Sequence, residues 1–236
     1  MKVIMIKQQL LADIKRLLRE PILAIIFFVP LLALTAIKLM LLFGMPILYR
    51  ETGFDLTPYY GYILSIVLFI SPMMLGAVTG FIMIDDRDER ITDLISITPL
   101  GYWGYLGNRL LLPFLSSILY TLLGYSILDI NELDGLRLSL LSLMMGIESI
   151  IVGLILFLIS DNKVKGLTYA KGLSGLMVTA LADLAHIPWL SVLCGFLPFY
   201  WVCRLIVQPL SIFTIIMLLL VHGFWLGAAL FKAHKS

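Results

Sequence analysis

The chain has 236 residues, of which 61% are apolar or aromatic and only 14% are charged, with a formal net charge of +2. A soluble domain of this size cannot bury so much apolar surface, so the composition excludes a soluble enzyme, a nucleic-acid reader and a disordered chain. The mean hydropathy of +1.03 indicates a protein whose solvent is largely lipid.

An amphipathic helix is predicted over residues 1–20. The segment lacks the apolar core and the cleavage site of a signal peptide. Basic and amide side chains cover most of it, and one stripe at helical spacing is apolar: Val3, Ile6, Leu10, Ile14, Leu17 and Leu18. This pattern is typical of a helix that lies in the membrane interface.

Six segments follow that are apolar over the length of about 20 residues that a spanning helix needs. They cover residues 22–45, 59–84, 109–128, 138–160, 169–186 and 210–231. A further apolar stretch over 187–209 is broken by three prolines and predicts a pair of short re-entrant or interfacial helices. The sequence therefore predicts an all-α, polytopic membrane protein that forms a single transmembrane domain over 1–236.

The basic residues predict the orientation of this bundle. With the N-terminus inside, 13 of the 17 Lys and Arg residues lie in cytoplasmic segments, namely 1–20, 85–109, 161–171 and the C-terminal tail. The positive-inside rule therefore places both termini in the cytoplasm of a cell-membrane protein. A seventh full span would place the lysines of the C-terminal tail outside the cell and is therefore disfavoured.

The most polar segment between two spans covers residues 85–100. Acidic residues open it, at the end that a helix dipole favours, and Pro99 closes it. Ile91, Leu94 and Ile95 form an apolar face at i, i+3 and i+4 spacing. A short amphipathic helix on the cytoplasmic side buries such a face either in a groove of a soluble partner or against its own bundle.

The order of these features resembles the permease subunit of type-2 ABC exporters over nearly the whole chain. The features are the N-terminal helix ending in Arg-Glu-Pro, the acidic run with Thr98-Pro99-Leu100 after span two, and Leu197-Pro198 before the last span. Within that class the chain looks most like small drug-export permeases of the fluoroquinolone type. The resemblance implies a homo- or heterodimer with the export path between its subunits. It also implies an ATPase that docks on the helix after span two, at these positions: Glu89, Ile91, Thr92, Leu94, Ile95, Thr98 and Pro99. The usual Gly-Thr of that helix is Ile91-Thr92 here.

The chain has no phosphate-binding loop of the form GxxxxGK[ST], since no two glycines are five residues apart and no glycine precedes a lysine. ATP and magnesium are therefore expected on a partner ATPase, with no cofactor in this chain. Cys194 and Cys203 are nine residues apart in an apolar stretch and predict no metal or redox motif. A membrane assembly or immunity factor that binds a partner without transport is the alternative non-enzyme class.

Two enzymatic alternatives have local motifs. Asp85, Asp86, Glu89 and Asp93 form DDxxExxxD, which resembles a magnesium-diphosphate motif of intramembrane prenyltransferases. The other acidic cluster, over 129–134, is predicted on the opposite side of the membrane. The pattern GxSG around Ser174, with His222, resembles an intramembrane serine protease, but that family's early-span histidine motif is missing.

Polar residues inside the predicted spans are candidates for the translocation path, because such residues usually face protein or a watery route. They are Glu148, Asp183 and His222. Burial between helices is the structural alternative for Glu148 and His222, and solvation at the interface is the alternative for Asp183. The two GxxxG motifs, Gly76–Gly80 and Gly223–Gly227, permit close helix packing within a subunit or between subunits. Trp189 and Trp201 are predicted to be interface anchors.

Overall fold

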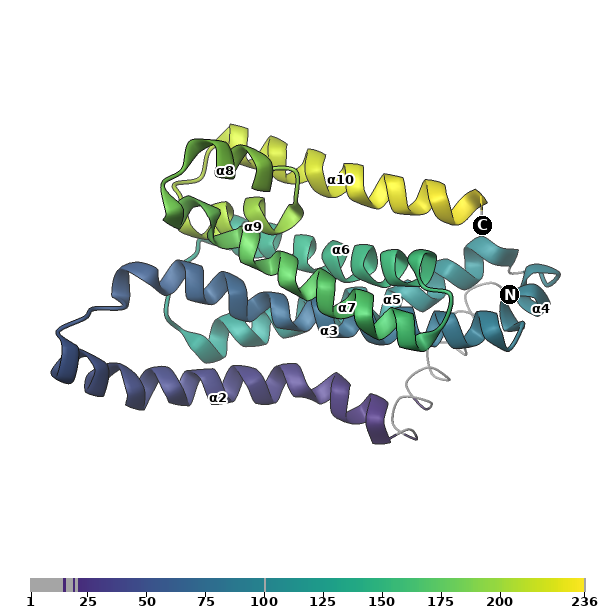
Figure 1. Ribbon diagram of the computed structural model, residues 1–236, viewed down its shortest axis with the longest axis horizontal. Coiled ribbons are helices and arrows are strands. Elements are labelled where there is room, and N and C mark those ends of the chain that lie inside the picture. Colours follow the sequence, from purple (N-terminus) through teal and green to yellow (C-terminus); the bar gives the residue numbers. More distant parts are fainter. Residues whose placement is uncertain (1–14, 16–18, 20, 100, 236) are drawn as a thin grey trace.

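The computed structural model describes residues 15, 19, 21–99 and 101–235. The interfacial helix predicted over 1–20 lies outside these residues, except for Lys15 and Arg19. The described chain is helical without strands, which confirms the all-α prediction. The long helices lie side by side in one elongated bundle (Figure 1).

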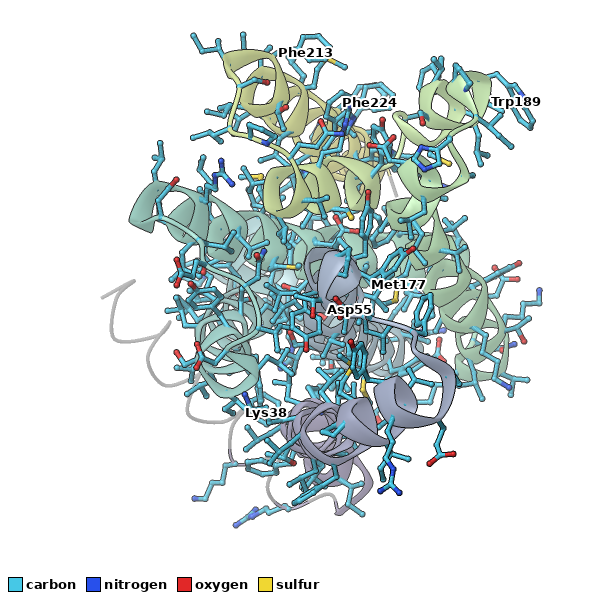
Figure 2. All side chains as sticks on the ribbon, turned by 90° about the vertical axis from the view of Figure 1, so that its left-hand side faces the viewer. Lys38, Asp55, Met177, Trp189, Phe213 and Phe224 are labelled. Carbon is cyan, nitrogen blue, oxygen red and sulfur yellow. The ribbon has the colours of Figure 1, made fainter. Side chains whose placement is uncertain are left out.

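Five described helices are long and apolar enough to cross a membrane. They are α2 (Pro21–Thr52), α3 (Tyr60–Asp88), α5 (Gly101–Leu128), α6 (Gly135–Ile159) and α10 (Ile212–Lys235). The short helix η1 (Thr57–Tyr59) joins α2 to α3. Helices α3 and α6 are the most buried of the five, whereas α2 and α10 are the least buried. Figures 1 and 2 show α2 and α10 on opposite sides of the central helices.

The fifth predicted span, 169–186, differs from a single α-helix. The chain forms α7 (Lys163–Gly175) and continues as a 3-10 helix, η2 (Leu176–Ala185). Lys163, Lys165 and Lys171 keep α7 polar, so only the η2 half has the composition of a span. At their standard rises the two segments together extend for about 40 Å. They lie along α3, from the end where α6 finishes to the end where α8 lies (Figure 1).

The stretch predicted to be broken before the last span forms α8 (Pro188–Cys194) and α9 (Pro198–Val207). Each helix begins at its proline, where the missing N–H group costs nothing. The two helices are bent by 117° relative to each other. Figure 1 shows α8 and α9 at one end of the bundle. The short helix α4 (Ile91–Ser96) and the C-terminal end of α10 lie at the opposite end.

A close contact between α3 and α6 depends on the first GxxxG motif. A Cβ atom at Gly76 would lie 2.6 Å from the carbonyl oxygen of Ser149 and 2.8 Å from Cβ of Val152. At Gly80 it would lie 2.9 Å from Cβ of Leu156. This motif therefore packs helices within one chain, whereas Gly223 and Gly227 have open space around them.

We expect Gly76→Val to lower the free energy of unfolding by about 1–3 kcal/mol, because the added atoms meet backbone that cannot move aside. Gly227→Val is the matched control, because nothing lies within 4 Å of a Cβ atom there. Thermal unfolding of the purified variants in detergent measures both effects. Equal shifts for the two variants would contradict this assignment of the first motif.

Candidate functional site

The short helix α4 lies at the end of the bundle that is remote from α8 and α9 (Figure 1). Leu94 is 63% exposed and Ile97, directly after the helix, is 84% exposed. Ile91, Thr92 and Ile95 are partly covered, and α4 packs on α3 and α5. The remaining predicted docking residues are exposed: Glu89, Thr98 and Pro99. The predicted docking positions therefore share one loop, with Leu94 and Ile97 facing outward.

The acidic run before α4 belongs to the end of α3, which continues to Asp88, and does not open the short helix as predicted. A left-handed residue, Arg90 with φ of 56°, makes the turn between the two helices. Carboxylates are disfavoured at a helix C-terminus by the dipole. They are tolerated here because cationic side chains from other helices lie beside them.

Asp86 is the central residue of this arrangement and is completely buried. Its Oδ2 atom lies 2.7 Å from Nη2 and 2.8 Å from Nε of Arg109, and the hydroxyl of Tyr105 donates a hydrogen bond to the same oxygen at 2.8 Å. Both partners belong to α5. The end of α3 is thereby fixed to the start of α5, on the two sides of the α4 loop.

The neighbours of Asp86 connect the same end of α3 to two more helices. Asp85 Oδ2 lies 2.6 Å from Nζ of Lys163 at the start of α7. Arg87 donates hydrogen bonds to the carbonyl oxygen of Ser160 at 2.6 Å and to that of Phe157 at 3.2 Å, at the end of α6. We call these five side chains the charged collar: Asp85, Asp86, Arg87, Arg109 and Lys163.

Beside the collar, the ammonium group of Lys165 in the first turn of α7 forms a hydrogen bond and an ion pair with Asp161, which lies in the loop before this helix. This contact lowers the pKa of the Asp161 carboxyl group from its ordinary value. The carboxylate therefore stays ionised at neutral pH, and this end of the bundle carries charges of both signs.

The collar removes the main support for the magnesium-diphosphate hypothesis. Asp85 and Asp86 point to different cationic partners and do not share a site. Over residues 21–99 and 101–235, no three His, Cys, Asp or Glu side chains are grouped so as to hold a metal ion. The Asp93 side chain lies outside the described part of the structure.

The serine-protease hypothesis also lacks its dyad. Ser174 is exposed on α7 and donates its hydroxyl to the carbonyl oxygen of Ala170 at 2.9 Å. His222 is buried on α10, where Nδ1 lies 2.8 Å from the carbonyl oxygen of Leu218. The side chain that faces Nε2 of His222 is that of Glu148, at 3.7 Å, and not that of Ser174.

Two of the three predicted path residues lie together. Glu148 of α6 and His222 of α10 are each 1% exposed, and Glu148 Oε2 lies 3.7 Å from His222 Nε2. Neither of these two atoms has a hydrogen-bond partner in the described part of the chain. The pair is therefore a buried polar contact between two candidate spans, and the structure places it away from the surface of this chain.

The third predicted residue, Asp183, lies in a different cluster at the end of η2. Its Oδ1 atom accepts hydrogen bonds from Ser191 and Tyr200, both at 2.9 Å. Its Oδ2 atom accepts one from Gln208 at 3.0 Å and lies 3.1 Å from Nε of Arg204. One carboxylate therefore joins η2, α8 and α9, and it borders a cavity.

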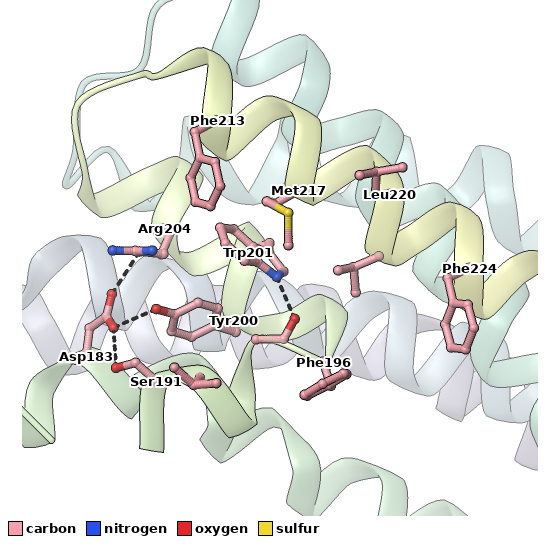
Figure 3. Close-up of a pocket in the computed structure, with 13 residues that line it drawn as sticks. Asp183, Ser191, Phe196, Tyr200, Trp201, Arg204, Phe213, Met217, Leu220 and Phe224 are labelled. Carbon is pink, nitrogen blue, oxygen red and sulfur yellow. Dashed lines mark hydrogen bonds and ion pairs between the residues drawn. The ribbon is translucent and has the colours of Figure 1, made fainter. Parts of the chain in front are cut away.

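This cavity, which we call the aromatic cavity, lies between α8, α9 and α10 and measures about 710 Å³. Figure 3 shows Asp183 and Arg204 at one end of it and Phe224 at the other. Most of its lining is apolar or aromatic, including Phe196, Tyr200, Trp201, Phe213, Met217, Leu220 and Phe224. Figure 2 shows Phe213 near the end of the bundle that faces the viewer.

Sequence reasoning missed this cavity. Trp201 was expected at the membrane interface but is only 4% exposed, and its indole N–H donates to the carbonyl oxygen of Gly195 at 2.7 Å. Trp189 is exposed. The available signal was Arg204, a single cation in an apolar segment, because such a residue requires a partner.

Comparison with known proteins decides the family. The family described as "Fluoroquinolones export permease protein Rv2686c-like" matches residues 13–232. The chain belongs to this family. The family's description names an export permease, which points to a transporter rather than an enzyme, and together with the five long apolar helices of the described chain it indicates a multi-pass membrane protein. The resemblance to small permeases of the fluoroquinolone type is confirmed.

Two curated relatives are similar to this permease over most of their length. One is the fluoroquinolones export permease protein MT2760 of Mycobacterium tuberculosis strain CDC 1551 / Oshkosh. The other is the fluoroquinolones export permease protein Rv2686c of Mycobacterium tuberculosis strain ATCC 25618 / H37Rv. Each is 28% identical over 200 residues, which cover 81% of this chain and 77% of the relative. No solved structure matches the chain.

Proposed function

We propose that this permease is the membrane subunit of an ATP-driven ABC exporter and that α4 docks a separate ATPase. The observation that carries the proposal is the exposed apolar face of α4, with Leu94 and Ile97, held on the charged collar. Lipid does not account for that face, because it stands at a bundle end rich in ionised side chains. A groove on a soluble partner buries it.

The energy source is the second part of the proposal. The sequence has no GxxxxGK[ST] loop, so ATP and magnesium belong to the partner subunit. Figure 1 places α4 and the end of α10 at the same end of the bundle. With that end in the cytoplasm, as the basic residues favour, α4 meets the ATPase and both termini are cytoplasmic.

The collar supplies a route for the coupling. A push on α4 acts on the turn at Arg90 and on the end of α3. Because Asp86 is fixed to α5, Arg87 to α6 and Asp85 to α7, the four helices move together at this end. ATP binding on the partner would thus switch a dimer of permease subunits between inward-open and outward-open states.

The substrate class follows from the relatives. Both carry names that specify fluoroquinolone export, so we propose amphipathic aromatic drugs as substrates of this chain. The energy of such transport comes from the ATPase, and the permease supplies the path and the docking surface.

The test is coupled transport. The tagged chain is purified together with a P-loop ATPase from the same membranes and reconstituted into proteoliposomes. We expect stimulation of ATP turnover by a fluoroquinolone, and ATP-dependent uptake of that drug into vesicles whose α4 end faces outward. An ATPase that binds the chain without stimulation or uptake would favour the non-transporting assembly factor instead.

A further inference from the structure

The aromatic cavity has the size of a small-molecule site. Pockets for drug-sized ligands measure about 300–1,000 Å³, and this one measures about 710 Å³. Its long wall is formed by α10 from Phe213 to Phe224, a separation of about 16 Å at the α-helical rise. The cavity is therefore long enough for a molecule of several fused or linked rings.

The charged end of the cavity offers hydrogen-bond donors to a ligand. Asp183 already accepts from Ser191, Tyr200 and Gln208 and pairs with Nε of Arg204, so its two oxygens are satisfied. Arg204 contacts Asp183 through Nε alone. Its two terminal nitrogens make no hydrogen bond within the described residues. These two nitrogens form the fork that matches a carboxylate.

The guanidinium group of Arg204 is held in place by two aromatic rings. Its central carbon lies 5.3 Å from the ring centroid of Tyr200 and 5.7 Å from that of Trp201. Trp201 is itself fixed by its hydrogen bond to Gly195 and by an edge-to-face contact with Phe213 at 5.8 Å between centroids. The charged end and the aromatic wall are thus preorganised together.

We propose that the aromatic cavity binds a planar aromatic molecule that carries a carboxylate. The carboxylate lies on the terminal nitrogens of Arg204, and the rings lie against the exposed aromatic side chains of the lining, Phe196, Phe213 and Phe224. This inference rests on the proposed export function and assigns it a substrate site. The aromatic lining, seen in Figure 3, favours flat rings over a lipid chain, because aromatic faces stack on aromatic faces.

The first test measures binding of a fluoroquinolone acid and of its methyl ester to the purified full chain in nanodiscs, without any ATPase. We expect Arg204→Gln to weaken binding of the acid by about tenfold, since it removes a charge-assisted hydrogen bond, and to change binding of the ester by no more than about twofold. Arg137→Gln is the matched control. Arg137 also pairs through Nε with an aspartate, Asp134 at 3.3 Å, but it does not line the cavity.

A second pair of variants tests the cavity without altering a charge. Leu220 lines the cavity and its neighbour Leu219 does not, and both side chains are exposed, by 61% and 47%. We expect Leu220→Trp to abolish binding of both the acid and the ester, because it fills the space that the rings need. Leu219→Trp should bind both like the unmodified chain, and thermal unfolding confirms that each variant is folded.

Three results would overturn the inference. One is binding of the acid that Arg204→Gln and Leu220→Trp leave unchanged. Another is equal loss of acid and ester in Arg204→Gln. The third is a bound phospholipid, detected by native mass spectrometry, that Leu220→Trp removes while drug binding persists. If ATP-driven export survives in Leu220→Trp, the inference fails and the proposed function stands.

Discussion

Replacing Leu94 with Asp is expected to abolish ATP-driven export while the protein still inserts and folds. Leu94 is exposed on α4, so the change costs the isolated chain little. In the docked complex the new carboxylate loses its water in an apolar groove, which costs several kcal/mol and weakens docking by about 100-fold or more. The measurement is drug-stimulated ATP turnover and uptake in proteoliposomes that hold both subunits.

Val164→Asp is the matched control for Leu94→Asp. Val164 is an apolar residue, 78% exposed, at the start of α7, the helix that the collar ties to the end of α3, but it lies outside α4. We expect Val164→Asp to keep normal coupling. Normal coupling in Leu94→Asp, or equal loss in the two variants, would refute the docking role of α4.

Removing the carboxylate of Asp86 is expected to be the most destabilising single change at the collar. Asp86→Ala removes the carboxylate that lies 2.7 Å from the guanidinium group of Arg109 in a largely buried position. Breaking a buried pair from one side costs about 3–5 kcal/mol. The end of α3 would also lose its connection to α5, so we expect weaker coupling in the protein that remains folded. Thermal unfolding in detergent and drug-stimulated ATP turnover measure the two effects.

Asp88→Ala provides the comparison, because Asp88 is half exposed and lies 3.9 Å from Arg87. An exposed pair of this kind contributes about 0–1 kcal/mol, so we expect almost unchanged stability. Asp86→Asn should fall between the two, since its amide oxygen still accepts hydrogen bonds. If Asp86→Ala were as stable as Asp88→Ala, the collar would not be the structural tie described above.

The apolar runs of the sequence predicted the main helices well, because a spanning helix needs a length of apolar residues that little else produces. The runs at 59–84 and 138–160 correspond to α3 and α6 with ends shifted by a few residues. The polar start of α5, eight residues before the predicted 109, was missed because Tyr105 and Asn108 are buried by other helices and not by lipid. The same limit applies to α7, whose lysines mask a segment that continues into η2.

Part of the candidate site could be predicted from the sequence, and part of it could not. The local pattern around Leu94 was sufficient to predict a short amphipathic helix, because i, i+3 and i+4 neighbours share a face. The collar was not predictable, since Asp86 and Arg109 meet only after α3 and α5 pack together. The aromatic cavity likewise is lined by α8, α9 and α10, and no local spacing in the sequence shows that these three helices meet there.

Cross-linking from α4 tests the central claim most directly. The two native cysteines, Cys194 and Cys203, are buried, so a cysteine introduced at the 84%-exposed Ile97 reacts selectively. In native membranes, a cross-linker on Ile97→Cys should capture a P-loop ATPase, and the same reagent on Val164→Cys should capture far less of it. Capture of no ATPase from Ile97→Cys, or equal capture from both positions, would contradict the account.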